Sequence, residues 1–282
     1  MYLKEIETPF IEKLTGIYPR EEARNILLLI IEHLTGINLR QSANRYFGWD
    51  ADKQNAFIMI EKRLLQNEPI QYILKEAWFY DAPFYVDKNV LIPRPETEEL
   101  VHWIIRDAKA LSKPTILDIG TGSGCIPIIL KTKLPQSTVY ACDISQDALN
   151  IAQQNAHKLK AAISFIKADI LKPTEHVHLP KVDIIVSNPP YIPLSDKLQM
   201  RANVTVHEPS LALFVPDEDP LLFYKAIAGF AQTHLSPGGN IYLEIHEAFS
   251  KEVLEIFLST GFSANVKTDM QGKDRMIKCQ RR

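Results

Sequence analysis

The residues best suited to chemistry are Asn188, Pro189, Pro190 and Tyr191, which follow the apolar run at 182–186 almost directly. Such a run predicts a buried strand, so we expect these residues in a loop at a strand end. Two consecutive prolines fix two φ angles and remove two N–H donors, so carbonyl oxygens predominate in the loop. Asn188 adds a side-chain acceptor and Tyr191 a flat face, which together could hold a planar NH2-bearing group such as an amide or a nucleobase amine. The alternative is a stiff turn whose tyrosine only packs.

A second candidate site is a glycine-rich loop between a predicted strand, which starts at residue 115, and a predicted helix. Alternate glycines let the backbone approach a ligand closely and tolerate positive φ, and the helix start offers free N–H groups. These properties suit a nucleotide-like cofactor. No Gly-Lys-Ser/Thr follows and the spacing is not that of a dinucleotide fingerprint, so a pyrophosphate is not required. The loop residues are Gly120, Thr121, Gly122, Ser123 and Gly124.

Acidic residues follow the next two predicted strands. In a strand-helix-strand unit, Asp143 would reach the two ribose hydroxyls of an adenosine. The alternative is that Asp143 only caps the helix that begins near Gln146. Asp169 and Ile170 follow the third strand and could offer an acceptor and an apolar wall to an adenine. With Asp118, these residues and Asn188 would line one crevice, because the carboxyl ends of parallel strands meet at one edge of an open sheet.

Strands and helices alternate from residue 96 onward, as in an α/β doubly wound sheet. The final two strands are expected to form an antiparallel hairpin at the sheet edge, near 263–268 and 275–280. The predicted helices lie near 97–111, 125–133, 145–160, 220–235 and 248–259.

The N-terminal quarter has the spacing of a small helical bundle. One helix is expected to enter after Pro19 and end at Gly36, and another to follow Asp50. We therefore predict three parts: a helical domain over 1–75, a β-hairpin linker over 76–93, and a catalytic domain over 94–282. The helical domain either covers the fold or recognises a macromolecular substrate.

The composition indicates a soluble, cytoplasmic enzyme. The 282 residues are 46% hydrophobic and 23% charged, enough chain for a full core and two domains. Its three cysteines show no paired or metal-ligand spacing, and no signal peptide or membrane-spanning run is recognisable, so we expect no metal and no membrane. A net charge of −2 argues against a protein that grips duplex DNA and favours a protein substrate.

These motifs resemble those of class I S-adenosylmethionine-dependent methyltransferases and, more closely, of the PrmC/HemK family, the peptide chain release factor glutamine methyltransferases. The Asn-Pro-Pro-Tyr string is shared with DNA adenine methyltransferases, whereas the Arg-Pro-Glu-Thr-Glu segment is more specific. At His246 and at 216–219 the chain departs from the family pattern. The matching stretches are 69–74, 91–98, the glycine loop, 187–191, 208–209, 212–213, 244–245 and 272–275.

The resemblance implies a Rossmann-like seven-stranded sheet with an N-terminal helical bundle joined by a β-hairpin. It implies that S-adenosylmethionine is held by the glycine loop through methionine and ribose, by Asp143 at the ribose, and by Asp169 and Ile170 at the adenine. The segment from Asn188 to Tyr191 would hold the substrate amide. Arg94 and Glu98 would stand near the mouth of the site.

The resemblance also implies the reaction: methyl transfer to the glutamine amide in the Gly-Gly-Gln motif of class 1 release factors. The partners would then be release factors, with no stable nucleic-acid complex and a monomeric enzyme. Alternatives are methylation of an exocyclic adenine amine in nucleic acid, methylation of a ribosomal-protein glutamine, or an idle cofactor-binding module. A methylated amide nitrogen is acidic, so no strong base is needed, and the sequence offers no clear one.

Overall fold

The computed structural model describes residues 2–37 and 46–281, and its contacts divide the chain into two compact units. Unit 1 comprises Met1–Glu76 and Arg201–His207, and unit 2 comprises Ala77–Met200 and Glu208–Arg282. The short segment Arg201–His207 therefore packs with the N-terminal helices, although in the sequence it lies inside the part assigned to the catalytic domain. No helix in the described part of the chain is long and apolar enough to cross a membrane.

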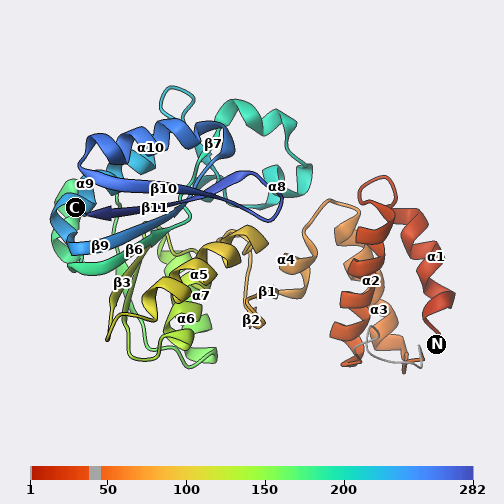
Figure 1. Cartoon of the computed structure of the whole chain (residues 1–282). Helices are drawn as coiled ribbons and strands as arrows, with labels where there is room; N and C mark the ends of the chain where they lie inside the picture. The colour runs from red at the N-terminus through yellow and green to blue at the C-terminus, as the bar shows by residue number, and fades with distance from the viewer. Residues whose placement is uncertain (1, 38–45, 282) are drawn as a thin grey trace. The chain divides into compact units, whose positions relative to one another are not determined.

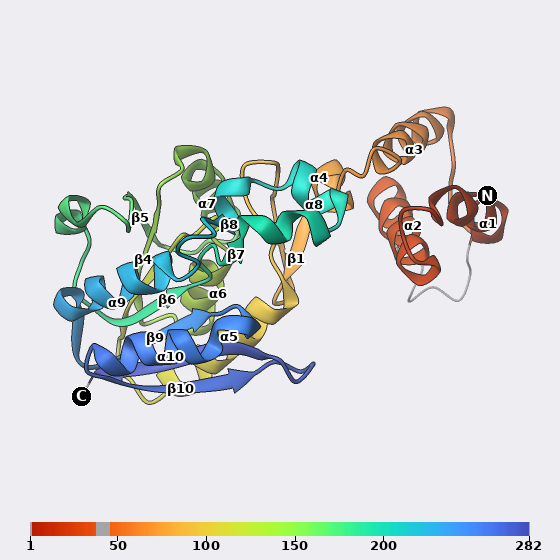
Figure 2. The same ribbon diagram turned by 90° about the horizontal axis from the view of Figure 1, so that it is seen from above.

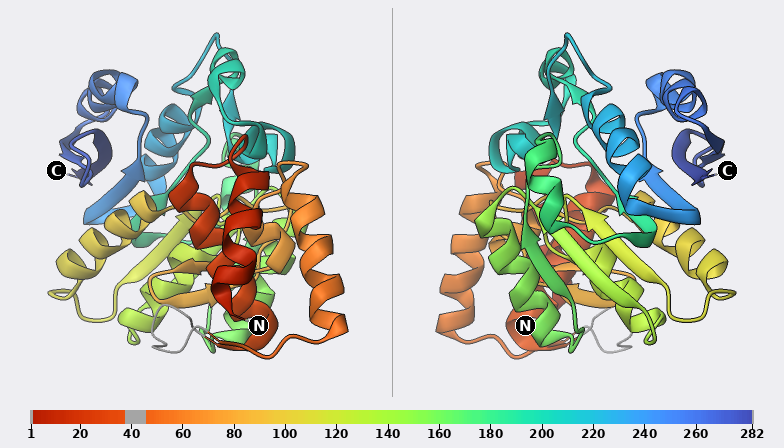
Figure 3. Two further views of the ribbon diagram at one scale, coloured as in Figure 1. Left: turned by 90° about the vertical axis from the view of Figure 1, so that its right-hand side faces the viewer. Right: turned by 90° about the vertical axis from the view of Figure 1, so that its left-hand side faces the viewer.

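Unit 2 is built on a seven-stranded sheet in the order β10-β11-β9-β6-β3-β4-β5 (Figure 1). The five strands from β9 to β5 are parallel, and β11 pairs antiparallel with both β9 and β10. The predicted C-terminal hairpin at the sheet edge is thus confirmed, and Figure 3 shows it in dark blue beside the C-terminus. The strands are β3 (Thr115–Ile119), β4 (Thr138–Asp143), β5 (Ser164–Lys167), β6 (Val182–Ser187), β9 (Leu235–Glu244), β10 (Phe262–Thr268) and β11 (Asp274–Arg281).

Helices cover both faces of this sheet because its central strands carry apolar residues on both sides. Neighbouring residues such as Ile116 and Leu117 point to opposite faces and join separate hydrophobic cores. Ile116 packs with α5, α6 and α7, and Leu117 with α9 and α10. These helices confirm the five predicted ones within a few residues at each end: α5 (Pro95–Ala108), α6 (Cys125–Lys133), α7 (Gln146–Lys158), α9 (Leu222–His234) and α10 (Ser250–Ser259).

Short elements complete unit 2. A hairpin of β1 (Ala77–Phe79) and β2 (Ala82–Phe84) turns through Tyr80 and Asp81, whose φ values of 52° and 63° suit a tight two-residue turn. It confirms the two short strands predicted there. The others are the paired β7 (Ile192–Pro193) and β8 (Phe214–Val215) and the 3-10 turns η1 (Pro173–His178), η2 (Leu194–Gln199), η3 (Ser210–Ala212) and η4 (Glu247–Phe249).

Unit 1 is helical, as predicted, and α1, α2 and α3 appear together in Figure 2. Pro19 precedes α2, Gly36 ends it with a left-handed φ of 71°, and the Asp50 carboxylate caps α3 by accepting from the Lys53 N–H. Apolar side chains on these helices form one buried core. The helices are α1 (Leu3–Leu14), α2 (Arg20–Thr35), α3 (Ala51–Leu64), α4 (Ile70–Leu74) and α8 (Ala202–His207).

Candidate active site

A cavity of about 300 Å³ lies at the carboxyl ends of the parallel strands of unit 2. Three segments that are distant in sequence meet there: the glycine loop after β3, the end of β4, and the proline-rich loop after β6. Three of the four strand-end residues predicted to share a crevice, Asp143, Asp169 and Asn188, line this cavity, whereas the buried Asp118 is not among its described lining residues. Of the predicted site residues, those that line it are Gly120, Gly122, Asp143, Asp169, Ile170, Asn188, Pro189 and Pro190.

The glycine loop has the backbone conformation that only glycine adopts easily. Gly120, Gly122 and Gly124 have φ values of 74°, 51° and 80°. A Cβ added at Gly120 or Gly122 would meet no other atom within 4 Å, whereas one at Gly124 would lie 3.0 Å from the Ala152 Cβ on α7. The first two glycines thus leave open space for a ligand, and the third allows the loop to approach a helix. Thr121 and Ser123 are buried, and together with Gly124 they lie outside the described cavity lining.

Asp143, the last residue of β4, holds the loop in place. Its Oδ2 accepts from the Gly122 N–H at 2.9 Å, and its Oδ1 accepts from the Ser145 N–H at 2.9 Å. The α7 N-cap is Ser145, whose hydroxyl accepts from the Ala148 N–H, so the alternative that Asp143 only caps this helix is wrong. Burial raises the pKa of Asp143. Each carboxylate oxygen can accept a further bond, so Asp143 can still bind ligand hydroxyls.

Asp169 and Ile170 form the far wall of the cavity. The Asp169 Oδ1 accepts from the Leu171 N–H at 2.9 Å, and the Lys172 Nζ lies 3.5 Å from its Oδ2. Ile170 is 7% exposed and presents an apolar surface. Sequence reasoning missed the rest of this wall, although Ile144 directly follows Asp143 in the chain. Apolar lining residues that sequence reasoning missed include Ile144, Leu171, Phe223 and Ile227.

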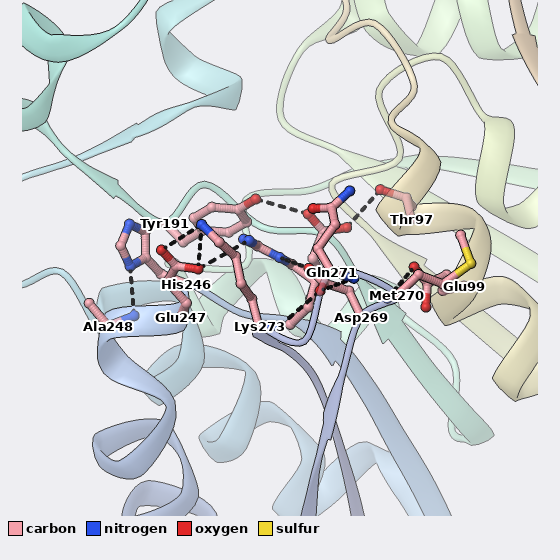
Figure 4. A network of polar contacts seen from close by, with 12 residues as sticks. Thr97, Glu99, Tyr191, His246, Glu247, Ala248, Asp269, Met270, Gln271 and Lys273 are labelled. Atoms are coloured by element: carbon pink, nitrogen blue, oxygen red, sulfur yellow. Dashed lines mark hydrogen bonds and ion pairs between the residues drawn. The ribbon is translucent and has the colours of Figure 1, made fainter.

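Asn188 belongs to a buried chain of hydrogen bonds. Its Nδ2 donates to the Thr97 hydroxyl at 3.1 Å, and Thr97 donates to the Glu244 Oε2 at 2.6 Å. The Tyr191 hydroxyl donates to the Glu244 Oε1 at 2.9 Å, and in Figure 4 the Thr97 and Tyr191 side chains point toward each other across the network. Burial raises the pKa of Glu244, and the two hydrogen bonds oppose that rise. Tyr191 therefore anchors the loop and is absent from the described lining of the cavity.

Arg94 and Glu98 lie near the start of α5, and the described cavity lining includes neither. The Arg94 Nη2 pairs with the buried Glu208 Oε1 at 2.5 Å. The Glu98 Oε1 accepts from the Tyr80 N–H at 2.9 Å in the turn of the β1-β2 hairpin. Both side chains thus already hold neighbouring segments in place.

The positions that depart from the family pattern have local partners. The His246 Nδ1 accepts from the Ala248 N–H at 3.1 Å, and its ring centroid lies 5.9 Å from that of Tyr191. Burial lowers the pKa of His246. The Asp217 Oδ1 accepts from the Ser195 N–H at 2.9 Å, which ties together two loops near β7 and β8. We assign these residues a part in shaping the backbone around the site.

Asn155 on α7 is a structural residue of the site that no sequence pattern indicates. Its side chain is fully buried, accepts from the Tyr85 N–H at 2.7 Å, and donates to the carbonyls of Tyr85 and Ser123 at 2.9 Å each. It thereby joins the glycine loop to the segment that continues into residues 88–91, which line the cavity. An asparagine in an amphipathic helix does not reveal such long-range partners.

The site fits a nucleoside that carries positive charge. Asp118, two residues before Gly120, is 0% exposed, and neither carboxylate oxygen has a hydrogen-bond partner among the described residues. Burial raises the pKa of Asp118 to about 7; the neighbouring Thr121 hydroxyl, which lies outside good hydrogen-bond geometry, lowers it only in part. A cationic group near the loop would compensate this buried carboxyl, while Asp143 offers acceptors and the apolar wall faces a ring.

Comparisons with known proteins agree with this geometry. Residues 100–208 match the family model "Methyltransferase small domain". Release factor glutamine methyltransferase of Flavobacterium psychrophilum is 42% identical over 99% of both chains, and that of Bacteroides thetaiotaomicron is 42% identical over 96% of this chain and 97% of its own. The chain belongs to the release factor glutamine methyltransferase family. The resemblance noted in the sequence is thereby confirmed.

A solved structure supports the fold of this family member. A methyltransferase from Pyrococcus furiosus superimposes with a TM-score of 0.51 at 16% identity, over 82% of this chain and 98% of that chain. At this identity the match bears on the fold alone. It agrees with the seven-stranded sheet, so the expected Rossmann-like class I methyltransferase fold is confirmed.

Proposed function

We propose that this enzyme transfers a methyl group from S-adenosylmethionine to the side-chain amide nitrogen of the glutamine in the Gly-Gly-Gln motif of class 1 release factors, and so modulates translation termination. Membership of the family supports the substrate. The observation that carries the chemistry is the position of Asn188 and Pro189 in the wall of a cavity that also contains the glycine loop.

The residues that would hold the cofactor are those of the glycine loop, Asp143 at the ribose, and Asp169 and Ile170 at the adenine. S-adenosylmethionine would supply an electrophilic methyl group. The unpartnered Asp118 carboxyl supports a cationic ligand, and the open space at Gly120 and Gly122 supports close approach to the backbone. This assignment uses the chain's own acceptors and requires no metal.

The chain's contribution to the reaction is to prepare a poor nucleophile. The lone pair of an amide nitrogen is delocalised into its carbonyl. If the Asn188 Oδ1 and the Pro189 carbonyl oxygen each accept one N–H bond, the nitrogen can pyramidalise and direct its lone pair toward the cofactor side of the cavity. Fixed acceptors of this kind lower the barrier by positioning and electrostatic preorganisation. The proton leaves after transfer, when the nitrogen has become acidic.

Pro190 and Tyr191 would give the loop its shape, Pro190 through its fixed φ and Tyr191 through its bond to Glu244. Arg94 and Glu98 would stabilise the segments at the entrance, through Glu208 and Tyr80 respectively.

Unit 1 would recognise the folded release factor, because a narrow site that binds one glutamine amide cannot by itself distinguish among glutamines. Large apolar side chains on α3 are exposed to solvent and offer a contact surface: Ile58 is 48% exposed and Met59 is 58% exposed. A net charge of −2 supports a protein substrate over a nucleic acid. We propose that the enzyme acts as a monomer and forms no stable complex with nucleic acid.

The test is methyl incorporation from labelled S-adenosylmethionine into a purified release factor, a ribosomal-protein mixture and DNA. We expect label on the factor and none on a variant in which the motif glutamine is replaced by alanine. In Asn188→Ala, single-turnover transfer should fall by about a hundredfold, while cofactor affinity should stay within about threefold. Label on DNA or ribosomal protein with none on the factor would overturn the assignment.

A further inference from the structure

We propose that Thr97 and Glu244 are positioning residues that fix which way round the Asn188 side-chain amide stands, so that its oxygen faces the substrate. This inference rests on the proposed function, because it explains why the Asn188 side-chain oxygen is placed to accept from the substrate amide. Nothing in the reaction itself brings Thr97 or Glu244 into contact with a ligand. They act through Asn188.

The orientation matters because an asparagine amide has two ends of nearly the same shape and opposite chemistry. One end is an oxygen that accepts hydrogen bonds, and the other is an NH2 group that donates two. A rotation of the Asn188 amide by half a turn would present donors to a substrate that itself carries an NH2 group. Two donors would then face each other and the acceptor would be lost.

Thr97 can select one orientation because its hydroxyl carries a single proton. That hydroxyl lies 2.6 Å from the Glu244 Oε2, and an ionised carboxylate can only accept. The proton therefore points to Glu244, and the Thr97 oxygen is left to accept. The Asn188 amide lies 3.1 Å from that oxygen, so the atom facing it must be the donor, Nδ2. The Asn188 Oδ1 is then left to face the cavity, which Asn188 lines.

Burial raises the pKa of Glu244, and its partners oppose that rise. One oxygen accepts from the Thr97 hydroxyl and the other from the Tyr191 hydroxyl at 2.9 Å, and the positive charge of Arg275 also favours the ionised form. The Arg275 Nε in turn donates to the Asp269 Oδ2 at 3.2 Å. Asp269 also accepts from the N–H groups of Gln271 and Lys273, as drawn in Figure 4.

The burial of this chain of bonds argues for such a purpose. Thr97 is 3% exposed and Glu244 is 2% exposed. Apolar residues of similar volume at such positions are often neutral or favourable for stability, because burying a carboxylate costs solvation energy. A role only in attaching α5 to the sheet would not require a carboxylate. A directional relay requires an acceptor-only group at one end and a hydroxyl in the middle.

The kinetic test compares Thr97→Val, which keeps the shape and removes the hydroxyl, with Thr97→Ser, which keeps the hydroxyl. Thr97→Val should lower the single-turnover transfer rate by about tenfold to a hundredfold, with cofactor affinity within about threefold. Thr97→Ser should transfer methyl groups at a rate within about fivefold of the wild type. Thr132→Val is the matched control, because the Thr132 hydroxyl bonds only to the Ile128 carbonyl on the exposed side of α6, within the described residues.

A double-mutant cycle separates positioning from general damage. If Thr97 acts through Asn188, then Thr97→Val added to Asn188→Ala should lower the remaining rate by less than about threefold. A wild-type rate in Thr97→Val, or an equal fold-loss in both backgrounds, would overturn the inference. A wild-type enzyme that transfers nothing to the release factor would instead refute the proposed function.

The orientation can also be observed without substrate. In the 15N-labelled enzyme, the Asn188 side-chain NH2 signals are identified by their loss in Asn188→Ala. We expect slow hydrogen exchange for these signals in the wild type and in Thr97→Ser, and fast exchange in Thr97→Val. Signals and exchange that are unchanged in Thr97→Val would overturn the inference whatever the substrate proves to be.

Discussion

Asp118→Asn should remove a pH-dependent loss of stability that the buried carboxyl imposes on the free enzyme. Burial raises the pKa of Asp118 from 3.8 to about 7. The difference is about 3 units, and at about 1.4 kcal/mol per unit the folded state should lose about 4 kcal/mol when this carboxyl ionises. The side chain is fully buried, so solvent screens little of this effect.

The sign follows from proton binding. Because the folded pKa lies above the unfolded one, the folded chain binds a proton at Asp118 that the unfolded chain has already released between pH 3.8 and 7. The stabilising effect of that proton is complete below the unfolded pKa and is lost as the pH rises through the folded pKa. An asparagine stays neutral, so its contribution does not change across this window.

The assay is urea unfolding of the wild type and Asp118→Asn at several pH values between about 4.5 and 8. The intrinsic fluorescence of the buried Trp103 in unit 2 can follow it. The free energy of unfolding of the variant minus that of the wild type should increase by several kcal/mol from the acid to the alkaline end. A difference that stays constant across the range, in two chains that both unfold cooperatively, would refute the assignment of a raised pKa to Asp118.

Three further results are expected. Asp143→Ala should weaken cofactor binding by about 1 to 3 kcal/mol in calorimetry, because ribose hydroxyls would lose their partner, and an unchanged dissociation constant in a folded variant would reject the ribose assignment. Asn155→Leu leaves buried backbone groups of Tyr85 unpaired and should lower the stability of unit 2 by about 2 to 4 kcal/mol in urea unfolding. An unaltered urea midpoint would contradict a stabilising role for the Asn155 bonds. Combined Ile58→Ser and Met59→Ser should raise the Michaelis constant for the intact release factor but not for a Gly-Gly-Gln peptide, and equal effects on both would argue against recognition by α3.

The parts of the fold that the sequence predicted are those encoded by local patterns. Alternating glycines between an apolar strand and a helix specify positive φ and a tight loop, and the structure has both at Gly120 and Gly124. Apolar runs that end in a polar residue specify buried strands, so Asp143 and Asn188 were placed at strand ends without knowledge of the sheet order. The rule that carboxyl ends share one edge then brought them together.

The parts that the sequence did not predict depend on contacts between distant segments. Asn188 meets Thr97 across 91 residues, and Thr97 meets Glu244 across 147 residues. No local pattern states which hydroxyl or carboxylate faces which amide, because the pairing depends on how α5 packs against the sheet. The same holds for Arg201–His207, which packs in unit 1 although its neighbours in the chain belong to unit 2.

Glu244 also obeys the rule that polar residues at the carboxyl ends of parallel strands share one edge of the sheet. It is the last residue of β9, which runs parallel to β6, so its carboxylate lies at the same edge as Asp118, Asp143 and Asn188. The three acidic groups differ in what surrounds them. Asp143 accepts from two backbone N–H groups, Glu244 accepts from two hydroxyls, and Asp118 has no such partner among the described residues. A carboxylate whose partners come from the protein orients its neighbours, whereas a buried one without them favours its neutral form. Under the proposed function, the sheet edge would separate the two requirements of methyl transfer: Asp118 would favour a cationic cofactor, and Glu244 would fix the acceptor that an amide nitrogen needs.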